Sequence, residues 1–215
     1  HMPNGGLYFD VALGTVFRED LVKLTPEEWK DSIPVLPDED LKTIGDKAKY
    51  LRENTDKAIC GLFNGVRLGT VARPYAGMSP TEFLVALMLE EEYMRELFEA
   101  SAEAGIENLK RYLQAVGDNI DVIQMTTVDY GTQRAELFSP ELFHKLCTPN
   151  HRKANDYVHA HSNAKTFIHT CGSVYNIIPH IIEAGFDILN PIQLSADNMD
   201  PVKMKENFGG KIAFW

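Results

Sequence analysis

A histidine and a cysteine two positions apart, His169 and Cys171, are the residues whose types and spacing best suit chemistry. They follow a short, partly β-branched run, residues 164–168, which has the composition of a buried strand. Because residues i and i+2 of an extended chain point to the same side, we expect the imidazole and the thiol to face one space. Imidazole nitrogen and thiolate sulfur suit a borderline cation such as zinc, so the pair predicts a metal site at the end of a strand. The alternative interpretation is a cysteine that packs as a small apolar side chain.

Two ligands do not complete such a site, because a catalytic zinc takes about three protein ligands and keeps one open position. Asp129 comes shortly after another strand candidate, residues 120–127, and is predicted to be a third ligand or an acid/base group. Its alternative role is to cap the turn that follows it. Four amide side chains in the segments after strand candidates are predicted to contact either the substrate or the loop backbone: Asn64, Gln133, Asn190 and Gln193.

The remaining cysteines and histidines carry weaker signals. We expect Cys60 and Cys147 to be core residues. The other histidines outside the first two residues lie in helical stretches: His144, His151, His159, His161 and His180. Because His151, His159 and His161 do not share metal-binding spacing with one another, surface or core roles are favoured.

The elements that must position these residues alternate along the chain. Short apolar runs predict strands at residues 58–63, 120–127, 164–168, 186–189 and 211–215, and an extended segment is expected within residues 5–16. Helix-start signals occur at Thr25, Ser79, Ser139 and Asp200, each followed by proline, and the helix after Ser139 is expected to break near Pro149. Strand–helix alternation implies parallel strands with helical crossovers.

The polar residues after the strands favour one parallel architecture over another. In a (β/α)8 TIM barrel, catalytic residues collect at the carboxyl ends of the strands. A doubly wound sheet would also bind ligands there, but the sequence has no Gly-x-Gly-x-x-Gly fingerprint. The predicted fold class is therefore α/β, a (β/α)8 barrel.

Composition narrows the class of protein. The chain is 44% hydrophobic with a net charge of −10, which fits one folded domain over residues 1–215, with His1 and Met2 interpreted as a tag remnant. Basic residues do not cluster, which argues against nucleic-acid binding. No apolar run approaches the roughly 20 residues needed to cross a bilayer, and three cysteines argue against a disulfide framework, so we expect a cytoplasmic protein without membrane partners.

Several motifs together resemble the uroporphyrinogen decarboxylase superfamily. The similarity runs from about Asp38 to Trp215 and is carried by Asp129-Tyr-Gly-Thr-Gln133, Ser139-Pro-Glu-Leu-Phe143, His169-Thr-Cys-Gly172 and Ile182-Glu-Ala-Gly-Phe-Asp-Ile-Leu-Asn-Pro-Ile-Gln193. It is closest to the branch of zinc-dependent methyltransferases that work with corrinoid proteins. The resemblance implies a (β/α)8 barrel, and since a full barrel takes about 250 residues, we expect an incomplete one that lacks its C-terminal strands.

The resemblance also implies an activity. In this branch His169 and Cys171 would bind zinc, a later cysteine beyond Trp215 would be the third ligand, and a partner protein would carry the corrinoid (cobalamin). The expected function is methyl transfer or O-demethylation of a small methylated substrate. The first alternative is uroporphyrinogen decarboxylase, acting on a tetrapyrrole, although the arginine motif that grips its substrate carboxylates is not found. The second is a non-catalytic fragment that docks a corrinoid protein or forms a homo-oligomer through open sheet edges.

Overall fold

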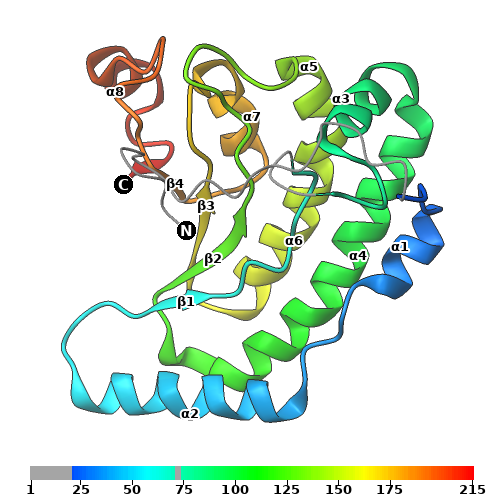
Figure 1. Cartoon of the computed structure of the whole chain (residues 1–215). Helices are drawn as coiled ribbons and strands as arrows, with labels where there is room; N and C mark the ends of the chain where they lie inside the picture. The colour runs from blue at the N-terminus through cyan, green and yellow to red at the C-terminus, as the bar shows by residue number, and fades with distance from the viewer. Residues whose placement is uncertain (1–20, 71–73) are drawn as a thin grey trace, which may run out of the picture.

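The computed structural model describes residues 21–70 and 74–215, so the extended segment expected within residues 5–16 lies outside the described part. Five parallel strands form one sheet in sequential order. They are β1 (Cys60–Leu62), β2 (Val122–Thr127), β3 (Lys165–His169), β4 (Ile188–Asn190) and β5 (Ala213–Phe214). Each strand pairs with the next one along the chain, and every pairing is parallel (Figure 1). In a doubly wound sheet the order of the strands reverses partway across the sheet. The unbroken sequential order found here confirms part of a (β/α)8 barrel.

Helices fill the connections between the strands. Thr25 and Ser79 each form a complete capping box at the start of α1 (Pro26–Ser32) and α3 (Pro80–Leu89). Further helices are α2 (Asp38–Asn54), α4 (Glu91–Val116), α7 (Ile178–Glu183) and α8 (Pro201–Phe208), with short 3₁₀ turns η1 (Gly117–Asn119) and η3 (Tyr175–Ile177). Within the described residues, none of the helices combines the length and the apolar character required to cross a bilayer.

The break expected near Pro149 is wrong. The chain stays helical from α5 (Pro140–Leu142) through a π-helical turn, η2 (Phe143–Cys147), into α6 (Thr148–His161). The Thr148 N–H reaches back five residues to the Phe143 carbonyl, and this wide turn joins the two helices. Pro149 then lies in the first turn of α6, directly after the π-helical turn.

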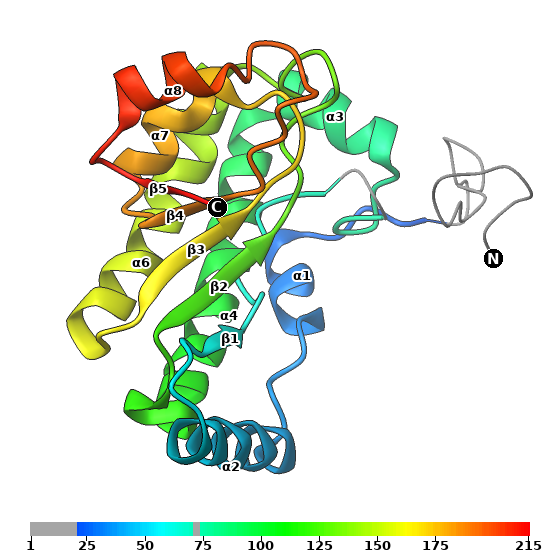
Figure 2. The same cartoon turned by 90° about the vertical axis from the view of Figure 1, so that its left-hand side faces the viewer.

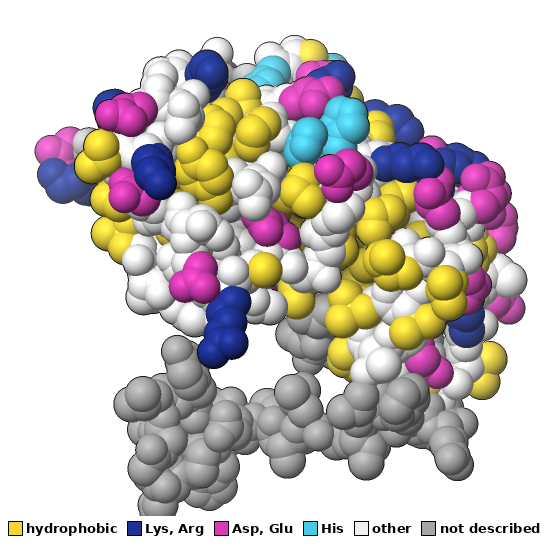
Figure 3. Space-filling view, turned by 90° about the horizontal axis from the view of Figure 1, so that it is seen from above, with side chains coloured by type: hydrophobic (Ala, Val, Ile, Leu, Met, Phe, Trp, Pro, Cys, Tyr) yellow, Lys and Arg dark blue, Asp and Glu magenta, His cyan; other side chains and the backbone are white. Residues whose placement is uncertain are grey.

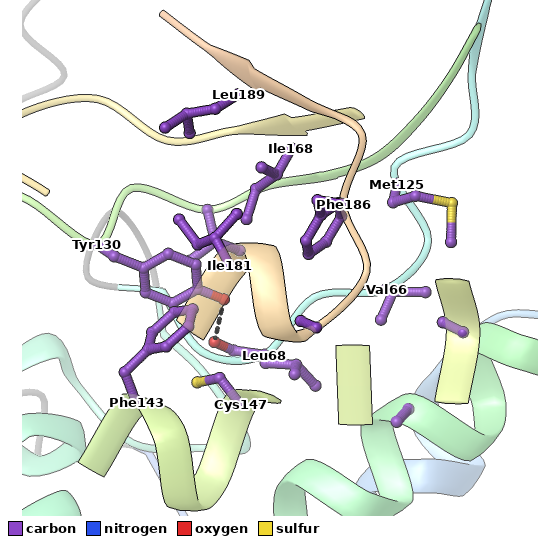
Figure 4. Close-up of a cluster of buried hydrophobic side chains, with 14 of the residues drawn as sticks. Val66, Leu68, Met125, Tyr130, Phe143, Cys147, Ile168, Ile181, Phe186 and Leu189 are labelled. Atoms are coloured by element: carbon purple, nitrogen blue, oxygen red, sulfur yellow. Dashed lines mark hydrogen bonds between the residues drawn. The ribbon is translucent and has the colours of Figure 1, made fainter. Parts of the chain in front are cut away.

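The core lies between the sheet and one helical layer. Helices α4, α6 and α7 cover the same face of the sheet, and α2 runs past the amino ends of the strands (Figures 1 and 2). Side chains from both layers interdigitate there, including Met125 of β2, Ile168 of β3 and Ile181 of α7, none of which is exposed (Figure 4). Because strand side chains alternate, His169 lies on the face opposite Ile168, away from this core.

Cys60 departs from the expected core role. Its thiol is exposed, whereas Cys147 is fully buried. On β1 a Cβ added at Gly61 would lie 2.5 Å from the Tyr112 hydroxyl of α4, so the neighbours Cys60 and Leu62 face the side of the sheet opposite the helices. Cys60 therefore lies on the side that the helices do not cover, which explains its exposure.

Candidate metal centre

His169 is the last residue of β3, and its ring is held in one orientation by Asn190 at the end of β4. Nδ1 of His169 lies 2.8 Å from Oδ1 of Asn190. The Asn190 amide nitrogen donates to the Trp215 carbonyl at 3.4 Å, so its oxygen is the group turned to the histidine. A carboxamide oxygen can only accept, so Nδ1 carries a proton, and in the neutral ring Nε2 presents the lone pair. This is the tautomer that a metal-binding histidine needs at Nε2.

Cys171 and Asp129 lie on the Nε2 side of His169. The Cys171 sulfur is 3.5 Å from Nε2, and a carboxylate oxygen of Asp129 is 4.0 Å from the same nitrogen. One ligand atom from each residue falls within 4.8 Å of the other two, a spacing that suits a shared ion. The structure thus brings together the three residues predicted to bind metal or act as acid and base.

The electrostatics of Cys171 bear on whether an ion fits. Burial, reinforced by the neighbouring Asp129 carboxylate, raises the pKa of Cys171 to about 11. Asp129 also accepts the Cys171 backbone N–H at 2.8 Å, so the carboxylate stays close to the sulfur. A thiolate beside a carboxylate is unfavourable unless a cation offsets both charges. The donor set of imidazole, sulfur and carboxylate therefore fits a borderline dication such as zinc.

Two glycines bring the loops that carry Asp129 and Cys171 into contact. Gly172 has a φ of +93°, and a Cβ there would lie 2.4 Å from the Gly131 carbonyl carbon. Around this contact the Tyr130 N–H donates to the Thr170 hydroxyl at 2.8 Å, and the Ser173 N–H donates to the Thr132 carbonyl at 2.7 Å. Both glycines stand within the motifs quoted above.

The two predicted glutamines lie beside this loop contact. Gln193 accepts the Gly172 N–H at 2.9 Å and donates to Gln133 at 2.8 Å, and Gln133 in turn donates to the Ser195 carbonyl. Both amides are thus engaged with loop backbone and with each other, which matches the loop-backbone role left open by the sequence. A contact with substrate stays a prediction for these two residues.

Asn64 lies apart from the cluster, in the segment after β1. It lines a cavity of about 640 Å³ whose wall also includes Trp29, Tyr75, Thr127 and Val128. The side-chain oxygen of Asn64 is buried and has no hydrogen-bond partner among the described residues. Because Thr127 and Val128 directly precede Asp129, this cavity reaches the carboxyl end of β2, next to the candidate centre.

Fold and site together define a parallel barrel protein with a candidate metal centre at the carboxyl rim of its strands. A family model described as uroporphyrinogen decarboxylase (URO-D) matches residues 15–214, and the chain belongs to this family. Among solved structures it is similar to a methyltransferase from Methanosarcina mazei, with 21% sequence identity and a TM-score of 0.53. That match covers 83% of this chain and 50% of the methyltransferase, so the chain spans about half the length of that structure. At 21% identity this similarity supports the fold of the chain and nothing more specific. Comparison with curated proteins gives no match.

Proposed function

We propose that this chain is the zinc-binding part of a methyltransferase that works with a corrinoid protein. One observation carries the proposal: ligand atoms of Asp129, His169 and Cys171 lie within 4.8 Å of one another at the carboxyl rim. The methyltransferase fold of the similar structure supports the same reaction class. A tetrapyrrole decarboxylase needs no sulfur ligand, so the orientation of Cys171 towards His169 favours methyl transfer over that alternative.

The residues of the centre take distinct roles in this proposal. His169 and Cys171 would hold zinc, which when bound supplies the Lewis acidity that keeps a thiol substrate ionised at neutral pH. Asn190 keeps the Nε2 lone pair of His169 turned towards Cys171. Asp129 is placed either to complete the ligand set or to accept the proton of an incoming substrate.

The cavity beside Asn64 is the proposed substrate site. Its volume of about 640 Å³ is within the range of small-molecule pockets. The buried, unpartnered oxygen of Asn64 can accept a hydrogen bond from a bound molecule. A small thiol would suit this cavity, and the corrinoid partner that supplies the methyl group would approach from the carboxyl rim.

Zinc content tests the proposal directly. Protein purified in zinc-containing buffer should carry zinc at the centre, and Cys171→Ser should lose it together with methyl transfer from a methylated corrinoid protein to a thiol. Cys60→Ser is the matched control, because that thiol is exposed at the opposite end of the strands, in register with Val122. If Cys171→Ser binds as many equivalents of zinc as the wild type, or if metal-free protein decarboxylates uroporphyrinogen, the methyltransferase proposal is wrong.

A further inference from the structure

A second group of metal-ligand side chains lies outside the candidate centre, where the π-helical turn η2 packs near α7. His144 projects from η2, and His180 and Glu183 lie one turn apart on α7. Each offers one ligand atom, and the three atoms fall within 4.8 Å of one another. Residue spacing does not predict this group, since His144 and His180 are far apart in the chain. The helical arrangement alone brings them together.

Glu183 is the common partner of the two imidazoles. Its Oε2 is 3.2 Å from Nδ1 of His144 and 3.7 Å from Nδ1 of His180, and the two rings are 4.7 Å apart between centroids. Nδ1 of His180 is buried and makes no hydrogen bond within the described part of the chain. A buried imidazole nitrogen without a partner is costly, and a metal ion is one group that would satisfy it.

Arg152 of α6 fixes the carboxylate of Glu183. Its guanidinium donates to Oε1 at 3.1 Å and twice to the Glu183 backbone carbonyl. Oε2 is therefore the oxygen left facing the imidazoles. An outer residue that orients a ligating carboxylate is a regular feature of metal sites.

The cluster borders open space. A cavity of about 610 Å³ is lined by the three residues together with Glu141, Lys145 and Arg152. In the view from above, histidine side chains gather beside acidic and basic ones on this part of the surface (Figure 3). Lys145 forms its ion pair with Glu91, which leaves the carboxylate of Glu183 to Arg152 and the two imidazoles.

We propose that His144, His180 and Glu183 form a second metal site, selective for a borderline dication of the zinc class. Two imidazoles and one carboxylate are a known zinc ligand set that leaves one position open. Mg²⁺ and Ca²⁺ prefer all-oxygen ligands and should bind poorly here. The site shares no residue with the candidate centre and does not depend on the proposed methyl transfer. Its position between helices α6 and α7 and the turn η2 suits a structural or regulatory role.

Zinc binding to the full chain carrying Cys171→Ser isolates this site from the first. We expect this background to bind Zn²⁺ in equilibrium dialysis, and His144→Ala or His180→Ala to weaken that binding by at least about tenfold, because losing a ligand costs more than losing an outer-shell partner. Glu183→Gln keeps a side chain that Arg152 can contact, yet should weaken binding as well. His161→Ala removes an exposed histidine of α6 that stacks on Tyr157, and should leave binding unchanged.

Two further readouts keep the test decisive. Co²⁺ bound in the Cys171→Ser background should show visible absorption that disappears in His144→Ala, while the far-ultraviolet circular dichroism stays unchanged. His144 is half exposed, so His144→Ala should stay folded even if His180→Ala does not. The proposal would be overturned if the His144→Ala and His180→Ala proteins bound zinc as tightly as the Cys171→Ser background. It would also be overturned if His161→Ala weakened zinc binding as much as those two variants do.

Discussion

Nδ1 of His169 donates a hydrogen bond to Oδ1 of Asn190 across the ends of β3 and β4, at 2.8 Å. This single contact decides which ring nitrogen faces Cys171 and Asp129. Because the Asn190 amide is itself fixed by the Trp215 carbonyl, the orientation does not depend on a rotatable hydroxyl. The resulting arrangement resembles the outer-shell support that metal-binding histidines usually have.

Asn190→Ala should weaken zinc binding at the candidate centre without removing a ligand. The variant frees the His169 ring, and losses of outer-shell partners typically cost about 10–100-fold in metal affinity. Equilibrium dialysis of the variant and the wild type measures the change. Asn119→Ala is the control, since that amide only caps the Val116 carbonyl at the end of α4. Unchanged affinity in Asn190→Ala would show that the histidine is held by other means.

Gly172→Ala should disturb the centre more than an equivalent change elsewhere. A methyl group at this position meets the Gly131 backbone at 2.4 Å, so the two loops must separate. We expect this overlap to cost roughly 1–3 kcal/mol in the free energy of unfolding, in addition to the strain of the positive φ at Gly172, and to weaken zinc binding. Gly210→Ala is a matched control, because Gly210 also has a positive φ of +81° but no atom within 4 Å of the added methyl. It should cost only the backbone strain, roughly 1–2 kcal/mol, and leave zinc affinity intact.

The buried histidine His151 should make stability depend on pH. Desolvation lowers its pKa to about 3, and its Nδ1 has no hydrogen-bond partner in the described structure. The unfolded chain therefore takes up the proton first as the pH falls from about 6.5 towards 3, and the folded state loses stability over that window. The slope from this group is up to about 1.4 kcal/mol per pH unit. Above pH 6.5 both states hold the neutral ring and the contribution is constant.

Urea unfolding at several pH values measures that slope. His151→Gln keeps a donor for the Tyr130 hydroxyl, 3.3 Å from the native ring, and should give a shallower fall in the free energy of unfolding below pH 6.5. His161→Gln should retain the wild-type slope. Parallel curves for His151→Gln and the wild type would contradict the assignment.

Tyr130→Phe should destabilise the fold although it leaves every candidate ligand in place. The Tyr130 hydroxyl is buried and donates to the Leu68 carbonyl at 3.1 Å, a contact drawn in Figure 4. Its removal leaves that carbonyl and the His151 ring without a partner, at a cost of roughly 1–3 kcal/mol. Chemical denaturation measures the loss, and zinc affinity in native buffer should stay close to that of the wild type. A neutral effect on stability would mean that other groups replace the hydroxyl.

The sequence allowed prediction of those features that depend on local pattern. Capping boxes at Thr25 and Ser79 located two helices, and the spacing of His169 and Cys171 correctly placed two side chains in one space. Features that depend on packing were missed. A helix break was predicted at Pro149 because a π-helical turn has no sequence signature that would reveal it. Cys60 was predicted to be a core residue because the sequence does not show which face of the sheet is covered. His144 and His180 meet only through the packing of two helices, which residue spacing cannot show.

The sequential order of the strands has a consequence for how the candidate centre forms during folding. Three consecutive strands are each ended or followed by residues of the centre: Asp129, His169 with Cys171, and Asn190. Contacts among these residues close loops of 21 to 42 residues rather than spanning the whole chain. Short loop closures carry the smallest entropic penalty and tend to occur early. The ligand cluster should therefore acquire its geometry with the β2–β4 unit, ahead of contacts that join distant ends of the sheet.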